Sequence, residues 1–187
     1  MAKFDQPGTN IWLIGMMGVG KTTLSRLIAR QLHYEMVDVD RELECATGVT
    51  ISTIFEIEGE ESFRQREKKI IASLASRIQS GKQRYVLATG GGSILLSENQ
   101  ARMRESGLVI YLQAEPEGLL SRVRANKKRP LLAVSDPLRE LCEIYRQRGP
   151  LYEAAADMIV HIDGNLGATH SANFLLERIR EQWSRCQ

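Results

Sequence analysis

Residues 15–23, with the sequence GMMGVGKTT, follow an apolar run and constrain the fold more than any other feature of the chain. They fit the P-loop pattern G-x-x-x-x-G-K-[ST], in which glycines let backbone N–H groups turn inward around phosphate oxygens. Such a loop binds phosphate when a strand precedes it and a helix follows it, because the helix N-terminus then faces the same anion. Both patterns are present here. The chain is therefore predicted to hold a polyphosphate.

The loop supplies the predicted nucleotide-binding residues Gly15, Gly18, Val19, Gly20, Lys21, Thr22 and Thr23. Lys21 is expected to reach the β- and γ-phosphates and to act in catalysis, and the Thr22 hydroxyl to coordinate Mg²⁺. A GTPase would carry an N-K-x-D motif, and the chain has none. A motor or transport ATPase would show an apolar strand that ends in Asp, whereas the run at 85–88 leads into Thr89 and three glycines.

Strand and helix patterns alternate along the chain. Apolar β-prone runs lie at residues 10–14, 35–39, 84–88, 108–112 and 158–162, and helical periodicity lies at 22–32, 65–78, 116–124, 137–145 and 168–183. Near-continuous apolar strands are typical of a parallel sheet with helices on both faces. The pattern predicts one doubly wound α/β domain over residues 1–187. Residues 126–137 lack clear periodicity, and we place a short lid at about 122–137.

Composition excludes several other classes of protein. No apolar run is long enough to span a membrane, and the N-terminus does not read as a signal peptide. Three distant cysteines fit neither a disulfide framework nor a metal site, which favours a cytoplasmic protein. A net charge of +2 gives no argument for nucleic acid. The basic run 122–129 has no aromatic residue to stack on bases, so it is either a solvated face or a segment that closes over a small anion.

Asp38 and Asp40 stand two residues apart at the end of a predicted strand. On a strand this spacing would put both carboxylates on one face, at the carboxyl edge of the sheet beside the P-loop. One could then serve Mg²⁺, and the other could orient an acceptor hydroxyl and take its proton. The alternative is that Asp40 only caps the helix that the next residues begin.

Two further features indicate an acceptor site. Gly90, Gly91 and Gly92 follow a predicted strand, and three successive glycines suggest a backbone that approaches a ligand closely. Arg64 stands at a predicted helix start, and Arg148 stands beside a predicted helix-breaking turn at Pro150. Each arginine alone is more often a surface ion-pair partner. Paired around one pocket, they would grip a carboxylate through two parallel hydrogen bonds.

These motifs together resemble the shikimate kinase family. In order along the chain they are G-x-x-G-x-G-K-T-T, D-x-D, EGEESFR, LATGGG, KRPLL and R-x-P-L-Y, and the resemblance runs from about residue 10 to residue 180. It implies a P-loop kinase fold with a five-stranded parallel sheet of order 2-3-1-4-5. It also implies transfer of the γ-phosphoryl group of ATP to the 3-hydroxyl of shikimate, with Mg²⁺ as cofactor.

The resemblance also assigns roles to individual residues. Asp40 would face the reacting hydroxyl, and an acceptor region at about 38–70 would contribute to the pocket. Asp38 would support Mg²⁺ through water, and the lid residue Arg129 would act on the phosphates. The implied adenine contacts are Arg122 and Asn165. The implied shikimate contacts are Asp40, Arg64, Gly90, Gly91, Gly92 and Arg148.

We expect a monomer that acts on ATP and shikimate and binds neither nucleic acid nor a membrane. Two rival interpretations share part of this pattern. Another small-metabolite kinase, for gluconate or a nucleotide, would keep the P-loop but would not need both arginines around a triple-glycine turn. A regulatory P-loop module would use the basic run as a surface for a partner.

Overall fold

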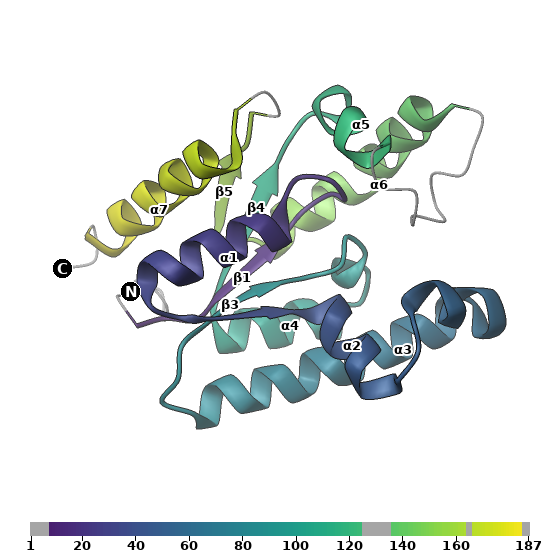
Figure 1. The fold of residues 1–187 in the computed structure, drawn as a ribbon, viewed down its shortest axis with the longest axis horizontal. Helices are drawn as coiled ribbons and strands as arrows, with labels where there is room; N and C mark the ends of the chain where they lie inside the picture. The colour runs from purple at the N-terminus through teal and green to yellow at the C-terminus, as the bar shows by residue number, and fades with distance from the viewer. Residues whose placement is uncertain (1–7, 125–135, 164–165, 185–187) are drawn as a thin grey trace.

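The computed structural model of the chain describes residues 8–124, 136–163 and 166–184, with the side chains of 121–124 left out. Its centre is a parallel sheet of five strands (Figure 1). Strand β1 (Ile11–Ile14) lies between β3 (Tyr85–Ala88) and β4 (Leu108–Gln113). Outside these, β2 (Glu35–Asp38) pairs with β3, and β5 (Met158–His161) pairs with β4. The predicted order 2-3-1-4-5 is confirmed.

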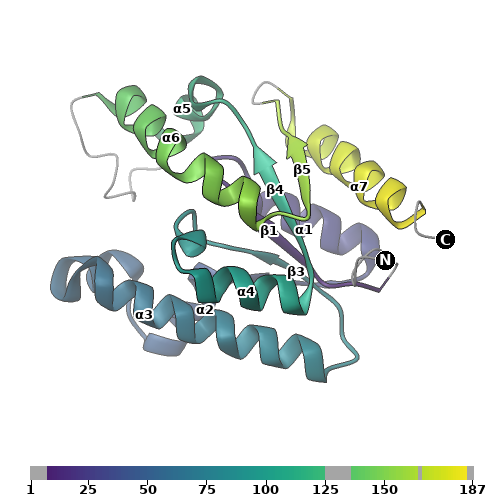
Figure 2. The ribbon, with the colours of Figure 1, turned by 180° about the vertical axis from the view of Figure 1, so that it is seen from behind.

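Helices cover both faces of the sheet. On one face α1 (Lys21–Leu32) packs against α7 (Ala168–Ser184) (Figure 1). On the other face lie α4 (Ser97–Ser106) and α6 (Pro137–Ala155), with α3 (Ile51–Ser80) alongside α4 (Figure 2). The short helix α2 (Val39–Thr47) packs on α3, and α5 (Pro116–Arg124) packs on α6. None of the helices in the described residues combines the length and apolarity needed to cross a lipid bilayer.

All five predicted strands are present within one residue at each end. The three central strands are buried apolar runs, whereas the edge strands β2 and β5 each bury only a valine, Val37 and Val160.

Two helical segments escaped prediction: the first part of α3, and α4 with the preceding 3₁₀ turn η1 (Ser93–Leu95). Helix α2 is predicted only in the alternative interpretation of Asp40 as a helix cap. In α4 the buried positions are Asn99, Met103 and Ser106, so two of its three core-facing residues are polar. Such a helix carries no apolar stripe for a periodicity argument to detect.

Helix α3 consists of two pieces joined at Gly59, whose backbone angles are φ 79° and ψ 177°. Thr50 caps the first piece by accepting a hydrogen bond from the N–H of Thr53 at 3.2 Å. The first piece packs through Ile54 into a small apolar cluster with Leu43 of α2. The second piece, which contains the predicted helix 65–78, packs into the main core.

Helix α6 corrects the prediction of a helix-breaking turn after Arg148. The helix continues to Ala155 with Pro150 inside it. Proline removes one backbone hydrogen bond of the helix, but Tyr152 and Ala155 are fully buried, and their packing keeps the chain helical. As a result, Arg148 and Tyr152 are four residues apart on one helix and lie on the same side of it.

Candidate active site

The predicted site residues meet at the carboxyl edge of the sheet. Asp38 at the end of β2 pairs with Ala88 of β3, which also pairs with Leu13 of β1, so these three strands end together. A cleft of about 1260 Å³ opens there. Among the residues that line it, those predicted from the sequence are Gly18, Val19, Gly20, Lys21, Thr22, Thr23, Asp40, Arg64, Gly90, Gly91, Gly92 and Arg148.

The loop between β1 and α1 has a backbone that glycine makes possible. Gly18 and Gly20 have φ angles of 84° and 99°, in the left-handed region. Gly15 begins the loop directly after β1, and a Cβ on it would come within 2.5 Å of the Leu112 carbonyl oxygen. Gly20 caps α1 without a side-chain hydrogen bond, and the first turn of α1 has no acidic residue. This end of the helix lines the cleft, so the positive end of its dipole favours an anion there.

Lys21 is held in the loop by the backbone. Its Nζ donates hydrogen bonds to the carbonyl oxygens of Gly15 at 2.7 Å and Met16 at 3.0 Å, and the residue is only 8% exposed. The ammonium group therefore lies within the loop next to this end of the helix. This arrangement presents positive charge where the sequence predicts a polyphosphate.

Asp38 joins the loop to α2 through both oxygens of its carboxylate. Its Oδ2 accepts a hydrogen bond from the Thr22 hydroxyl at 2.7 Å, and its Oδ1 accepts from the N–H groups of Asp40 and Arg41 at 3.1 and 3.3 Å. Asp38 is thus the N-cap of α2, and the prediction that Asp40 could be the cap is wrong. The idea that both aspartates share one face of a strand is also wrong, because β2 ends at Asp38.

Asp40 reaches the cleft from the first turn of α2 instead. Its Oδ1 lies 2.9 Å from the point that a Cβ on Gly90 would occupy, and Oε1 of Glu67 lies 2.9 Å from the same point. Both carboxylates therefore pack directly against the Gly90 backbone. Val39 between the aspartates is fully buried in the core, as expected for a side chain that points away from the site.

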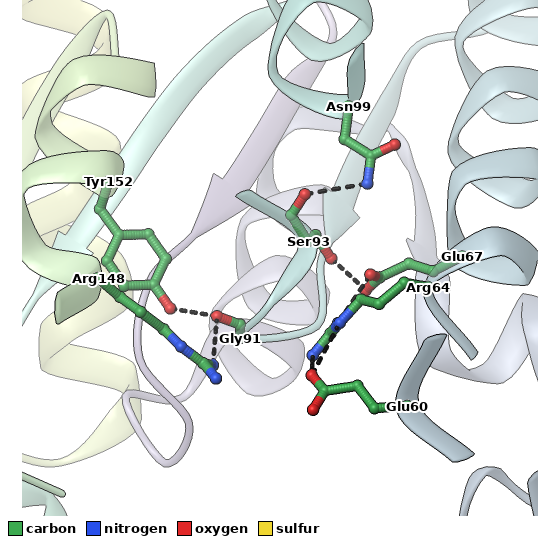
Figure 3. Close-up of polar contacts among 8 residues, drawn as sticks. All are labelled: Glu60, Arg64, Glu67, Gly91, Ser93, Asn99, Arg148 and Tyr152. Atoms are coloured by element: carbon green, nitrogen blue, oxygen red, sulfur yellow. Dashed lines mark hydrogen bonds and ion pairs between the residues drawn. The ribbon is translucent and has the colours of Figure 1, made fainter. Parts of the chain in front are cut away.

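Arg64 is fixed by two glutamates of its own helix (Figure 3). Its Nη1 pairs with Glu67 at 2.8 Å, and its Nη2 pairs with Glu60 at 2.9 Å. Glu67 is fully buried and also accepts a hydrogen bond from the Ser93 hydroxyl at 2.6 Å. Burial by itself would lower the pKa of the Arg64 guanidinium, but Glu67 and then Glu60 outweigh it, so the net shift is upward. Arg64 stays charged at the cleft wall.

Arg148 lies on the other side of the triple-glycine turn. Its Nη1 donates to the carbonyl oxygen of Gly91 at 3.2 Å, and the Tyr152 hydroxyl donates to the same oxygen (Figure 3). The Gly91 carbonyl thus points toward α6, whereas Ser93 two residues later turns toward α3. The two arginines flank the glycine turn from opposite sides, as the sequence predicts for a carboxylate-binding pair.

The structure does not place the side chains of three of the predicted site residues. Arg129 and Asn165 lie outside the described residues, as does most of the lid predicted at 122–137. Arg122 belongs to α5, and its side chain is not described. Sequence reasoning missed Glu67 and Tyr152. Of the two, only Tyr152 could have been found from the sequence, because a residue four positions after Arg148 would lie on the same side of a helix. Pro150 between them predicts a helix end instead.

The sheet order and the loop at its carboxyl edge define the chain as a P-loop kinase, an ATP-dependent phosphotransferase of the α/β class. A family model described as shikimate kinase matches residues 17–180. The chain therefore belongs to the shikimate kinase family.

Individual relatives agree with this assignment. The chain is 46% identical over 170 residues to a shikimate kinase of Methylococcus capsulatus, covering 91% of this chain and 89% of that protein. It is 50% identical over 148 residues to one of Neisseria meningitidis serogroup C, covering 79% and 84% respectively. A solved structure of a shikimate kinase from Acinetobacter baumannii in complex with shikimate superposes with a TM-score of 0.85 at 39% identity, covering 96% of this chain and 95% of that one.

Proposed function

We propose that the protein transfers the γ-phosphoryl group of ATP to the 3-hydroxyl of shikimate, giving shikimate 3-phosphate and ADP. One observation carries the choice of acceptor: Arg64 and Arg148 flank the triple-glycine turn in the cleft that also holds the P-loop and Asp40. Two arginines around one turn suit a small carboxylate. The relative solved with shikimate bound has the same fold over 96% of this chain.

Each side of the cleft has a distinct task in this reaction. The loop N–H groups and Lys21 bind the phosphates and stabilise the charge that develops on them during transfer. Arg64 and Arg148 hold the carboxylate of shikimate, which orients its ring across the cleft. Asp40 accepts a hydrogen bond from the 3-hydroxyl and takes its proton as the oxygen–phosphorus bond forms. We propose that Arg129, Arg122 and Asn165 contribute to the nucleotide side.

The chain's own residues fit a magnesium ion that is bound mainly by nucleotide. Thr22 and Asp38 offer hard oxygen donors 2.7 Å apart beside the loop. Within the described residues there is no group of three or more His, Cys, Asp or Glu that could form a complete metal site. Mg²⁺ in kinases usually keeps waters and phosphate oxygens and takes few protein ligands. When bound, it would neutralise phosphate charge, with Thr22 as a direct ligand and Asp38 acting through water.

Exchanging Asp38 for Asn should make activity depend more steeply on magnesium. Asn still caps α2, so the melting temperature should stay close to that of the wild type. The loss of one negative charge next to Thr22 should weaken metal binding about 10- to 100-fold, as typical for an indirect metal contact. Steady-state rates titrated with Mg²⁺ test this. Asp136→Asn, at the N-cap of α6, is the matched control and should show wild-type magnesium dependence. An Asp38→Asn enzyme that shares that dependence would contradict the assignment.

Exchanging Gly92 for Ala should weaken shikimate binding while the fold persists. A Cβ on Gly92 would lie 2.2 to 2.6 Å from three atoms of the Arg64 guanidinium, and only the arginine can move away. We expect the KM for shikimate to rise about tenfold, equal to 1.4 kcal/mol, with the KM for ATP unchanged. Gly149→Ala, where a Cβ meets nothing within 4 Å, is the control. Equal shikimate KM values for the two variants would remove Gly92 from the acceptor site.

The proposed function itself is tested by ADP release from ATP in the presence of candidate acceptors. Shikimate should support turnover, and quinate, gluconate and nucleoside monophosphates should support much less. Preference for gluconate or a nucleotide would identify another small-metabolite kinase. Salt-dependent binding of oligonucleotides without acceptor-dependent turnover would identify a regulatory module. The single domain, the monomeric state and the cytoplasmic location stay predictions from the sequence.

A further inference from the structure

Tyr152 contributes a hydroxyl group to the acceptor side of the cleft from a fully buried position. The residue is 0% exposed, and its ring stacks on Tyr111 with a centroid distance of 4.9 Å and an interplanar angle of 16°. Burial raises the pKa of the Tyr152 phenol, although the Arg148 guanidinium lowers it, so the hydroxyl stays protonated. It is therefore a permanent donor, and it donates to the Gly91 carbonyl.

The Gly91 carbonyl receives two donors from one helix, because Arg148 also donates to it at 3.2 Å (Figure 3). This oxygen is partly buried, and a carbonyl that loses its partners in such a place is destabilised. If Arg148 alone satisfied it, turning the guanidinium toward a ligand would leave the oxygen without a donor. With Tyr152 in place, Arg148 can turn to a carboxylate while the carbonyl keeps a hydrogen bond.

The same hydrogen bond fixes the direction of the next N–H group. In a trans peptide the N–H of Gly92 points opposite to the C=O of Gly91. Since the carbonyl is held toward α6, this N–H is turned toward the α3 side, where Arg64 lies (Figure 3). Within the described residues the Gly92 N–H donates no hydrogen bond. The turn thus presents a fixed donor on the Arg64 side of the cleft.

We propose that Tyr152 is a positioning residue for the acceptor: it holds the Gly91–Gly92 peptide with the Gly92 N–H toward the Arg64 side of the acceptor site, and it leaves Arg148 free to turn to the acceptor carboxylate. This inference rests on the proposed function. Tyr152 touches neither substrate, and it acts through the peptide and the arginine. Its ring packs in the core, but its hydroxyl serves substrate binding.

The test distinguishes the contribution of the Tyr152 hydroxyl to shikimate binding from that of the Tyr152 ring. Tyr152→Phe keeps the ring and its stacking on Tyr111, and we expect the KM for shikimate to rise about five- to twentyfold while kcat and the KM for ATP stay within about twofold. Tyr111→Phe is the matched control, because it removes the hydroxyl of the other ring in the stacked pair, and Tyr111 is not among the described residues that line the cleft or donate to the Gly91 carbonyl. It should leave all kinetic constants unchanged. Melting curves of both variants report on the fold.

A second measurement needs no substitution. In the wild-type protein the amide of Gly92 should shift in the NMR spectrum and gain protection from hydrogen exchange when shikimate is added. Wild-type shikimate KM in Tyr152→Phe, parallel losses for both substrates, or a Gly92 amide that does not respond to shikimate would each overturn the inference. A wild-type protein that releases no ADP with shikimate would instead overturn the proposed function.

Discussion

An Asp40→Asn enzyme should bind both substrates and turn over about 10²- to 10⁴-fold more slowly than the wild type, the range for a positioned general base. Asn keeps the size of the side chain and its place against Gly90, but it carries no negative charge to orient the acceptor hydroxyl or to take its proton. The fold should be unaffected, because Asp38, not Asp40, caps α2. Single-turnover rates at saturating substrates measure the chemical step directly.

Glu42→Gln provides a control from the same helix. Glu42 is in the first turn of α2, outside the residues that line the cleft, and its carboxylate pairs with Arg77 at 3.8 Å. This variant removes one charge from α2, as Asp40→Asn does, and should keep wild-type kcat. If both variants turned over like the wild type, Asp40 would have no role in proton transfer. If both slowed equally, the charge of the helix and not the site of the charge would matter.

Truncating each of the two arginines to Ala should have different effects on binding and on stability. Arg148→Ala should weaken shikimate binding by about 2–5 kcal/mol, as for a charge pair that has been removed from water. ATP binding and the melting temperature should change little, because the Gly91 carbonyl that Arg148 contacts keeps its hydrogen bond from Tyr152. Calorimetric titration with shikimate measures the loss. Arg146→Ala, two residues earlier on α6 and 75% exposed at its side chain, should bind shikimate normally.

Arg64→Ala should lose shikimate binding and also stability. Glu67 is 0% exposed, and without the Arg64 ion pair it would keep the Ser93 hydroxyl as its hydrogen-bond partner in the described part of the chain. Removing one partner of a buried ion pair costs about 3–5 kcal/mol of folding free energy, because an unpaired charge stays inside. Adding Glu67→Gln should restore much of the melting temperature but none of the binding. Restored binding in the double variant would show that Arg64 does not hold the carboxylate.

The features that could be predicted from neighbouring residues alone are the P-loop and the five strands. The five strands and their order are confirmed by the structure, in which Arg64, Arg148 and the glycine turn line one cleft with the P-loop. Each strand is a local apolar run, and the loop is a local pattern. The order of the strands and the meeting of distant motifs came from the family resemblance and not from periodicity.

The wrong or missed predictions concern residues whose structure is decided by contacts that the sequence pattern does not show. The alternation in residues 37–40 fits a strand, but the Asp38 carboxylate accepts N–H groups of the next turn and starts a helix instead. Glu67 lies in a run of charged residues that reads as a solvated helix face, and only the approach of Ser93 and the glycine turn buries it. Pro150 predicts a helix end, but the burial of Tyr152 outweighs the lost hydrogen bond.

The break in α3 at Gly59 matters for inhibitor design, because the residues before it and the residues after it line different parts of the cleft wall. Arg64 follows the break and belongs to the piece that packs into the main core, so compounds that imitate the acceptor carboxylate meet a stiff anchor. Ile51, Ser52 and Phe55 also line the cleft, but they precede the break. The Phe55 ring contacts the Phe63 ring of the second piece with a centroid distance of 4.7 Å. Apolar bulk on a scaffold should therefore be directed toward Phe55, which offers an aromatic ring at the cleft wall in place of a charged group.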